Sequence, residues 1–110
     1  MKLVLLKTEA DFAHNRFKKS FSSATLRVRT ALSSQNSPRF GFIIPKKVLP
    51  KVVDRNKVKR RLKSLLLKHQ PSIKPFDILF FPQKTSLTRT YPELEAELLQ
   101  IFKKLNLWKQ

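Results

Sequence analysis

The sequence contains no cysteine and, among its 110 residues, a single glycine, Gly41. Without thiols the chain can form neither disulfide bonds nor cysteine-ligated metal sites. With one glycine it cannot build the glycine-rich loops that hold phosphate in many nucleotide-binding proteins. Any phosphate binding must therefore come from lysine and arginine side chains or from helix N-termini. The absence of cysteine is also typical of reducing compartments, so we expect a cytoplasmic protein.

Acidic residues and long apolar runs are scarce as well. Seven Asp and Glu stand against 24 Lys and Arg, and the formal net charge is +17 at pH 7. The two histidines, His14 and His69, have no metal-ligand spacing, and we expect the protein alone to bind no metal. No apolar run approaches the roughly 20 residues that span a bilayer, and residues 1–6 are too short for a signal peptide. The large positive net charge predicts a polyanionic partner.

The positive charge is concentrated in residues 45–63, which read PKKVLPKVVDRNKVKRRLK. This stretch holds nine of the 24 basic residues and one acid, Asp54. Proline is favoured in the first turn of a helix, so Pro50 predicts a helix start, and the helix should continue to about Lys68. Four apolar residues recur with helical spacing and predict one buried side: Val58, Leu62, Leu65 and Leu66.

A cationic strip is predicted beside this apolar side of the helix. At about 100° per residue its members are Arg55, Asn56, Lys59, Arg60 and Lys63. Lys59 lies four residues from both Arg55 and Lys63, and like charges at this spacing destabilise a helix by roughly 0.2–0.5 kcal/mol per pair. A helix that only needed a solvated surface would mix the two signs of charge. The strip therefore indicates binding of a polyanion rather than a merely solvated face.

Three strands are predicted outside the basic stretch, at 22–32, 39–45 and 76–81. The first of them alternates between apolar and polar residues. Its inner side is expected to carry Leu26, Val28, Thr30 and Leu32, and its outer side Arg27, Arg29 and Ala31. This strand is therefore predicted to be half-buried, with arginines on its exposed side.

Two further helices are predicted, one near each end of the chain. The first is expected at about 8–19, with Thr8 as its N-cap. The second begins at Thr90, whose hydroxyl is expected to pair with Glu93 in a capping box. The order helix, strands, basic helix, strand, helix predicts one α+β sandwich domain over residues 1–110.

The basic helix also carries a family resemblance. The run Arg55-Asn56-Lys57-Val58-Lys59-Arg60, preceded by Pro45-Lys46-Lys47-Val48, resembles the signature of the bacterial ribonuclease P protein component. That family typically has a strand ending in a Lys-Lys pair, a short turn, and then Arg-Asn-Arg-x-Lys-Arg on a helix. Lys57 and Lys63 stand where arginine is usual, which keeps the charge but loses the planar fork that grips phosphate.

The resemblance implies a two-layer sandwich of about four strands and three helices, in the order α-β-β-(β)-α-β-α. A domain of a small-subunit ribosomal protein shares this fold. The resemblance also implies the function, that of the protein subunit of an endoribonuclease that removes the 5′ leader of precursor tRNA. In that enzyme an RNA subunit carries the hydrolysis and holds most of the magnesium, so no catalytic residue is expected in the protein. One protein is expected to bind one ribonuclease P RNA.

Two binding regions follow from the resemblance. The RNA-binding region is expected to comprise Lys46, Lys47, Arg55, Asn56, Lys57, Lys59, Arg60 and Lys63. The leader-binding cleft is expected to comprise Phe12, Arg16, Phe17, Arg27 and Arg29. Arg16 and Thr30 stand where the family commonly has aromatic residues, so the surface that stacks on leader bases should be thinner here, with Phe17 as a substitute. For Phe12, a plain core position is the alternative.

Three other functions compete with this interpretation. Another small basic RNA-binding protein, such as a ribosomal protein, would share the composition but not the ordered signature. A protein-only nuclease would need clustered carboxylates to hold metal ions, whereas the seven acids are scattered and only Asp54 and Asp77 suggest a pair. A helix on a membrane surface would need a broader apolar face than the four apolar residues of the basic helix provide.

Overall fold

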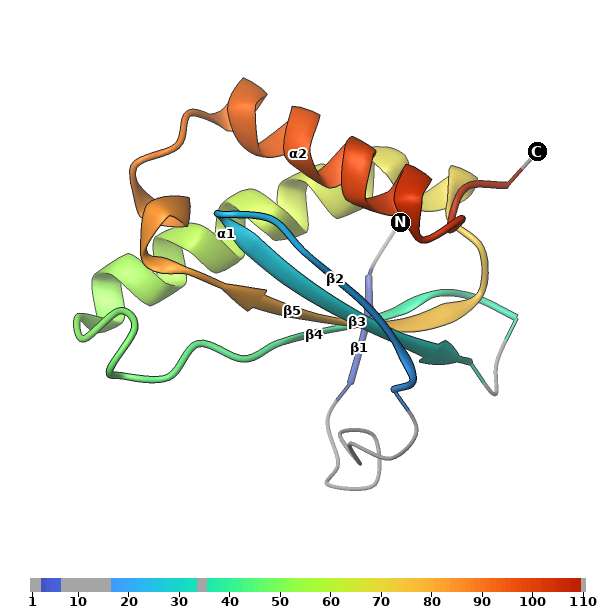
Figure 1. The fold of residues 1–110 in the computed structure, drawn as a ribbon, viewed down its shortest axis with the longest axis horizontal. Coiled ribbons are helices and arrows are strands. Elements are labelled where there is room, and N and C mark those ends of the chain that lie inside the picture. The colour runs from blue at the N-terminus through green and yellow to red at the C-terminus, as the bar shows by residue number, and fades with distance from the viewer. Residues whose placement is uncertain (1–2, 7–16, 34–35, 110) are drawn as a thin grey trace.

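A sheet of five strands forms one layer of the protein, and two α-helices lie together on one of its faces (Figure 1). The computed structural model describes residues 3–6, 17–33 and 36–109, and the structural statements below concern these residues. The strands are β1 Val4–Leu5, β2 Lys19–Ser22, β3 Leu26–Leu32, β4 Arg39–Phe42 and β5 Phe76–Pro82. The helices are α1 Val52–His69 and α2 Tyr91–Lys104, with the short 3₁₀ helices η3 Gln70–Ser72 and η4 Lys84–Leu87. This arrangement confirms the predicted α+β sandwich.

The sheet is mixed, with the strand order β1-β4-β5-β3-β2. β1 runs parallel to β4 and β4 parallel to β5, whereas β3 is antiparallel to both β5 and β2. The short edge strands β1 and β2 were not predicted, because neither is long enough to give a clear alternation. No helix within the described parts of the chain is long and apolar enough to cross a membrane.

The helix predicted over 8–19 falls largely on residues outside the described ones. Its predicted end is wrong, because Lys19–Ser22 is a strand that pairs with β3 from Lys19–Thr30 to Ser22–Arg27. The turn between the two strands is closed by Ser23, whose Oγ accepts hydrogen bonds from the backbone N–H of Thr25 and Leu26. Such local side-chain bonds favour a turn over a continuing helix.

The main core lies between the sheet and the two helices. Phe80 of β5 stands at its centre, with ring centroids 6.4 Å from Phe40, 5.6 Å from Phe42 and 6.1 Å from Phe102 of α2. The predicted apolar side of α1 is confirmed, since all four of its residues are fully buried: Val58, Leu62, Leu65 and Leu66. The capping box of α2 is confirmed as well, with Thr90 Oγ1 accepting from the Glu93 N–H and Glu93 accepting from the Thr90 N–H.

A second, smaller apolar cluster lies on the opposite face of the sheet. Its buried members are Leu6, Phe17, Ala31 and Leu79, and Ile43 and Phe81 pack against them partly exposed. Because side chains alternate along a strand, this face also carries Arg27 and Arg29 of β3. We call it the arginine face.

Two details of the predicted elements are wrong. Leu32, expected in the core, is 75% exposed, because it lies at the last position of β3, while Ala31 is buried on the arginine face. Pro50, expected in the first turn of α1, precedes the helix, whose N-cap is Lys51. The helix itself spans Val52–His69, close to the predicted range.

Candidate nucleic-acid interface

Four polar residues of α1 line a groove of about 430 Å³ on the surface of the helix. They are Asn56, Lys59, Arg60 and Lys63, and Val53 completes the lining. Lys59 and Lys63 also border a smaller hollow against β1 and β4, so the cationic surface reaches the edge of the sheet. We call the larger feature the α1 groove. Among the described residues, the charged side chains that line it are all cationic, which makes it suited to a phosphate backbone.

Arg55, predicted as a member of the same strip, has a different position. Its Nη1 donates to the carbonyl oxygen of Leu49 at 2.8 Å and to that of Pro50 at 2.9 Å. These bonds hold the loop that enters α1 against the first turn of the helix. Lys46 and Lys47 lie exposed earlier in the same loop.

Lys57 is not among the residues that line the α1 groove, and its helical angle places it on the flank of α1 that also carries Arg61. Its neighbour on that side, Arg61, donates from Nη1 to the carbonyl oxygen of Arg89 at 2.7 Å and so ties α1 to the start of α2. The eight residues predicted for RNA binding therefore fall on three surfaces: the α1 groove, the loop before the helix, and the flank of α1 that carries Lys57 and Arg61.

A second basic groove of about 430 Å³ lies where three loops meet at one end of the sheet. Its lining residues are Ala24, Lys47, Val48, Gln83, Lys84 and Thr85. We call it the loop groove. Thr85 Oγ1 donates to the carbonyl oxygen of Ala24 at 2.8 Å, and the Gln83 N–H donates to that of Thr25 at 2.9 Å, so its walls are tied together. Lys84 was not predicted as a site residue, because nothing in the sequence links it to Lys47.

The residues predicted for the leader-binding cleft are divided between described and undescribed parts of the chain. Phe12 and Arg16 lie outside the described residues. Arg27 is exposed on the arginine face, and Arg29 donates from Nη2 to the carbonyl oxygen of Phe17 at 3.1 Å. The Phe17 side chain is only 2% exposed, so it packs in the second cluster and presents no free ring face for a base.

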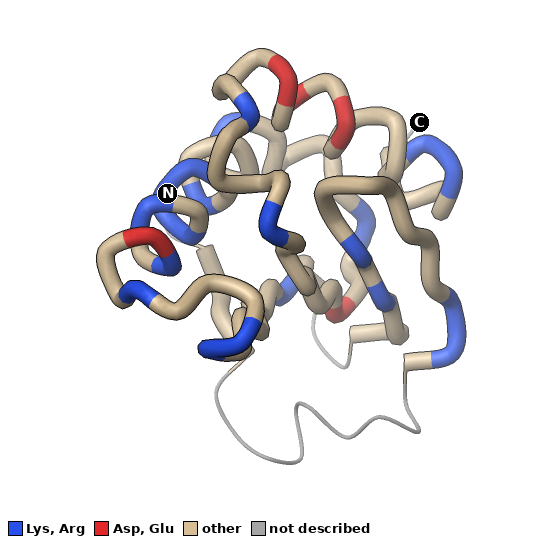
Figure 2. The backbone as a smooth tube through the Cα atoms, turned by 60° about the vertical axis from the view of Figure 1, so that its left-hand side comes forward, with Lys and Arg blue, Asp and Glu red and all other residues tan. Residues whose placement is uncertain are grey.

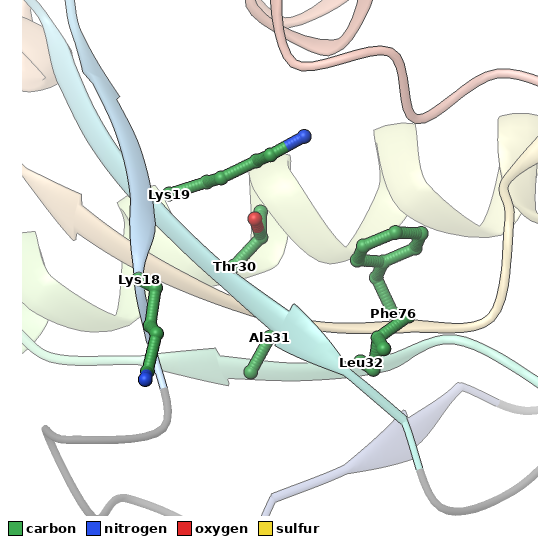
Figure 3. A pocket seen from close by; sticks show the side chains of 6 residues that line it. All are labelled: Lys18, Lys19, Thr30, Ala31, Leu32 and Phe76. Carbon is green, nitrogen blue, oxygen red and sulfur yellow. The ribbon is translucent and has the colours of Figure 1, made fainter.

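Thr30 lies on the side of β3 that faces the helices, as the alternation of the strand predicts, although the resemblance places it at a position that is commonly aromatic. Its side chain and that of Ala31 point to opposite sides of β3 (Figure 3). Thr30 is 2% exposed on the side covered by the helices, whereas Arg29 occupies the arginine face. Its neighbour Arg29 presents a guanidinium on the arginine face instead of an aromatic ring.

The hollow of about 380 Å³ around the end of β3 is a weaker candidate for an anion site. Its lining is formed mainly by Thr30, Ala31, Leu32 and Phe76, with Lys18 and Lys19 at its rim. The two lysine side chains point to opposite sides of the sheet (Figure 3). The hollow therefore does not concentrate positive charge.

Acidic side chains of the described residues do not line the α1 groove, although Asp54 is in the first turn of the same helix. Figure 2 shows basic positions spread over most elements and acidic ones at few places. On α2, Glu95 accepts a hydrogen bond from Lys68 Nζ at 2.7 Å, and His69 Nε2 lies 2.9 Å from the same oxygen. These contacts hold the pKa of Glu95 below its usual value, and the bond to Glu95 raises the pKa of Lys68. Within the described residues, no three His, Asp or Glu side chains come together as a metal site.

Comparison with known proteins decides the family. A family model described as Ribonuclease P matches residues 2–106. The chain belongs to the ribonuclease P family. It is 32% identical over 111 residues to the ribonuclease P protein component of Clostridium botulinum, covering 98% of this chain and 99% of that protein. It is 33% identical over 91 residues to the component from Alkaliphilus oremlandii, covering 82% and 79%.

Solved structures of ribonuclease P proteins have the same fold. The RNase P protein of Staphylococcus aureus superimposes with a TM-score of 0.85 at 23% identity, covering 98% of this chain and 100% of that one. The RNase P protein of Thermotoga maritima gives 0.71 at 24% identity, covering 78% and 82%. The resemblance inferred from the basic helix is therefore confirmed, and with it the predicted sandwich fold.

Proposed function

We propose that this chain binds ribonuclease P RNA through the α1 groove and the single-stranded 5′ leader of precursor tRNA through the arginine face. As a member of the ribonuclease P family it is the protein component of an endoribonuclease that processes the 5′ ends of tRNA. The two surfaces lie on different sides of the molecule, since α1 covers the sheet face opposite to the arginine face. One protein can then contact both RNAs at once.

The observation that carries this proposal is the α1 groove. Lys59, Arg60 and Lys63 lie together along it, and no acid is among its lining residues. The same helix is firmly held from beneath by its buried leucine side, so the cations are presented on a rigid support. Neutralising phosphates with such side chains releases counterions, which is the main source of affinity for an RNA backbone.

In this proposal the protein contributes no catalytic residue. Hydrolysis of the phosphodiester bond is carried by the RNA subunit, which also holds the magnesium ions. Asp77, half of the one pair of acids that the sequence suggested, is fully buried and bound to Arg39. The protein's role is to raise the affinity for substrate and for magnesium in a one-to-one complex in the cytoplasm.

Reconstitution with a ribonuclease P RNA at low magnesium tests this function. We expect the protein to restore cleavage of precursor tRNA at magnesium concentrations where the RNA alone is inactive. The gain in substrate affinity should grow with leader length over the first several nucleotides and should be absent for mature tRNA. Cleavage by the protein without RNA would contradict the proposal, as would equal affinity for substrates with and without a leader.

A further inference from the structure

Phe81 lies on the arginine face directly beside Arg27, although the sequence did not single it out. We propose that Phe81 is the base-stacking residue of this chain's leader site, with Arg27 beside it and the loop groove as the seat of the adjoining phosphates. This inference rests on the proposed leader binding and adds to it the residue that stacks on a base and the path that the leader follows. The ligand class is single-stranded RNA.

The strand register places the ring. Arg27 of β3 is the cross-strand partner of Phe81 of β5, and partners of this kind have their side chains on the same face. Phe81 belongs to the second cluster with Leu79, whereas its neighbour Phe80 is buried in the main core. Phe81 is only partly buried, so part of the side chain is left in contact with solvent.

The arginine face needs such a ring if it is to stack bases. Phe17, the other ring of the second cluster, is 2% exposed, and Thr30 is on the opposite face. Stacking of one base on an aromatic side chain is worth about 1–3 kcal/mol and does not depend on which base it is. Among the described residues of this face, Phe81 is therefore the aromatic side chain that keeps exposed surface for a base.

The loop groove begins just beyond the end of β5, two residues after Phe81. Gln83 lies two residues further, about 7 Å along an extended chain, and its Nε2 donates to the Phe81 carbonyl oxygen at 3.0 Å. Lys47 and Lys84 are the charged side chains of the groove, and both are exposed cations. A base on Phe81 therefore has Arg27 beside it on the neighbouring strand, and the next phosphates can reach the two lysines beyond the end of β5.

This arrangement does not distinguish one leader sequence from another. Stacking on Phe81 tolerates every base, and lysines and an arginine bind phosphates without regard to sequence. The leader site should consequently accept leaders of different sequence with similar affinity. A strong preference for one base at the stacked position would argue for hydrogen-bond readout by other residues and against this site.

The test compares holoenzymes assembled with wild-type, Phe81→Leu and Phe76→Leu protein. Leucine keeps an apolar side chain but removes the π-face, and Phe76 is the matched control, since it is also a partly buried phenylalanine of β5 but packs against the main core. Binding is measured for precursor tRNA with a ten-nucleotide leader and without a leader. We expect Phe81→Leu to weaken binding of the long-leader substrate by roughly five- to tenfold, with the leaderless substrate unaffected and Phe76→Leu showing the wild-type ratio.

The outcomes separate this inference from the proposed function. If wild-type protein shows no leader preference, the proposed function fails, and the inference with it. If wild-type shows the preference and Phe81→Leu keeps it, the function stands and Phe81 is not its stacking residue. Photocrosslinking of wild-type protein to a leader with photoreactive bases gives a second readout that does not depend on the variant's folding. A crosslink to the 81–84 segment supports the site, and crosslinks confined to other segments overturn it.

Discussion

The guanidinium of Arg39 holds the carboxylate of Asp77 through two hydrogen bonds, Nε to Oδ1 at 2.8 Å and Nη2 to Oδ2 at 2.6 Å. The two residues are direct partners on the parallel strands β4 and β5, and Asp77 is fully buried. Bidentate pairs of this kind are strong and fix geometry. Asp77 is therefore a structural residue that joins two strands, and it is not free to form a nuclease centre with Asp54.

Removing one partner of this pair should strongly destabilise the domain. Asp77→Asn leaves the Arg39 guanidinium largely buried without its counter-charge, and such changes typically cost about 3–5 kcal/mol. Urea unfolding measures the loss. Asp54→Asn, on the partly exposed start of α1, is the control and should cost less than about 1 kcal/mol. If both variants lose the same small amount, the Arg39–Asp77 pair does not stabilise the sheet.

Opposite sides of α1 should respond differently to truncation. Leu62→Ala removes a fully buried side chain and should cost about 2–5 kcal/mol of folding free energy. Arg60→Ala removes an exposed residue of the α1 groove and should change stability by no more than about 0.5 kcal/mol while weakening RNA binding. Thermal unfolding and a filter-binding assay with ribonuclease P RNA measure the two effects. Loss of folding in Arg60→Ala with unchanged RNA affinity of the folded fraction would reverse the assignment of the two sides.

The contact between α1 and α2 should depend on pH through Glu95. Its pKa is lowered in the folded protein by the hydrogen bond from Lys68 and then by that from His69. A carboxyl group whose folded pKa is below the unfolded value stabilises the fold above the usual value of 4.5 and loses that contribution as pH falls through the folded pKa. Glu95→Gln should therefore be less stable than wild type at neutral pH, and the two should converge as the solution is acidified. A constant difference from neutral pH down to about pH 2 would rule out this linkage.

The two helices were the most predictable parts of the molecule. Four leucine and valine residues at helical spacing define the buried side of α1, and Thr90 with Glu93 marks the start of α2. Both signals are local, because they depend on residues within one or two turns of each other. The cations of the α1 groove follow from the same periodicity.

The sheet and the cleft were less predictable, because they depend on pairing between distant segments. The two sides of β3 followed from its own alternation, with Arg27 and Arg29 on one side and Thr30 on the other, but its partner strands and their register did not. The position of Phe81 beside Arg27 depends on the pairing of β5 with β3, which the sequence does not show. Arg55 was predicted as a member of the cationic strip, but it donates to carbonyl oxygens of the preceding loop. Helical spacing does not predict the path of that loop.

The central claim is that the α1 groove binds the RNA backbone, and the salt dependence of binding tests it most directly. The affinity for ribonuclease P RNA is measured across a range of salt concentrations for wild type, Lys59→Ala/Lys63→Ala and Lys103→Ala/Lys104→Ala. Both double variants remove two positive charges, but Lys103 and Lys104 lie exposed in the last turn of α2. Each phosphate contact contributes roughly 0.7–0.9 to the slope of log affinity against log salt. We predict that the slope falls by roughly 1.4–1.8 for the α1 pair and stays unchanged for the α2 pair. Equal slopes for the two variants would contradict the claim.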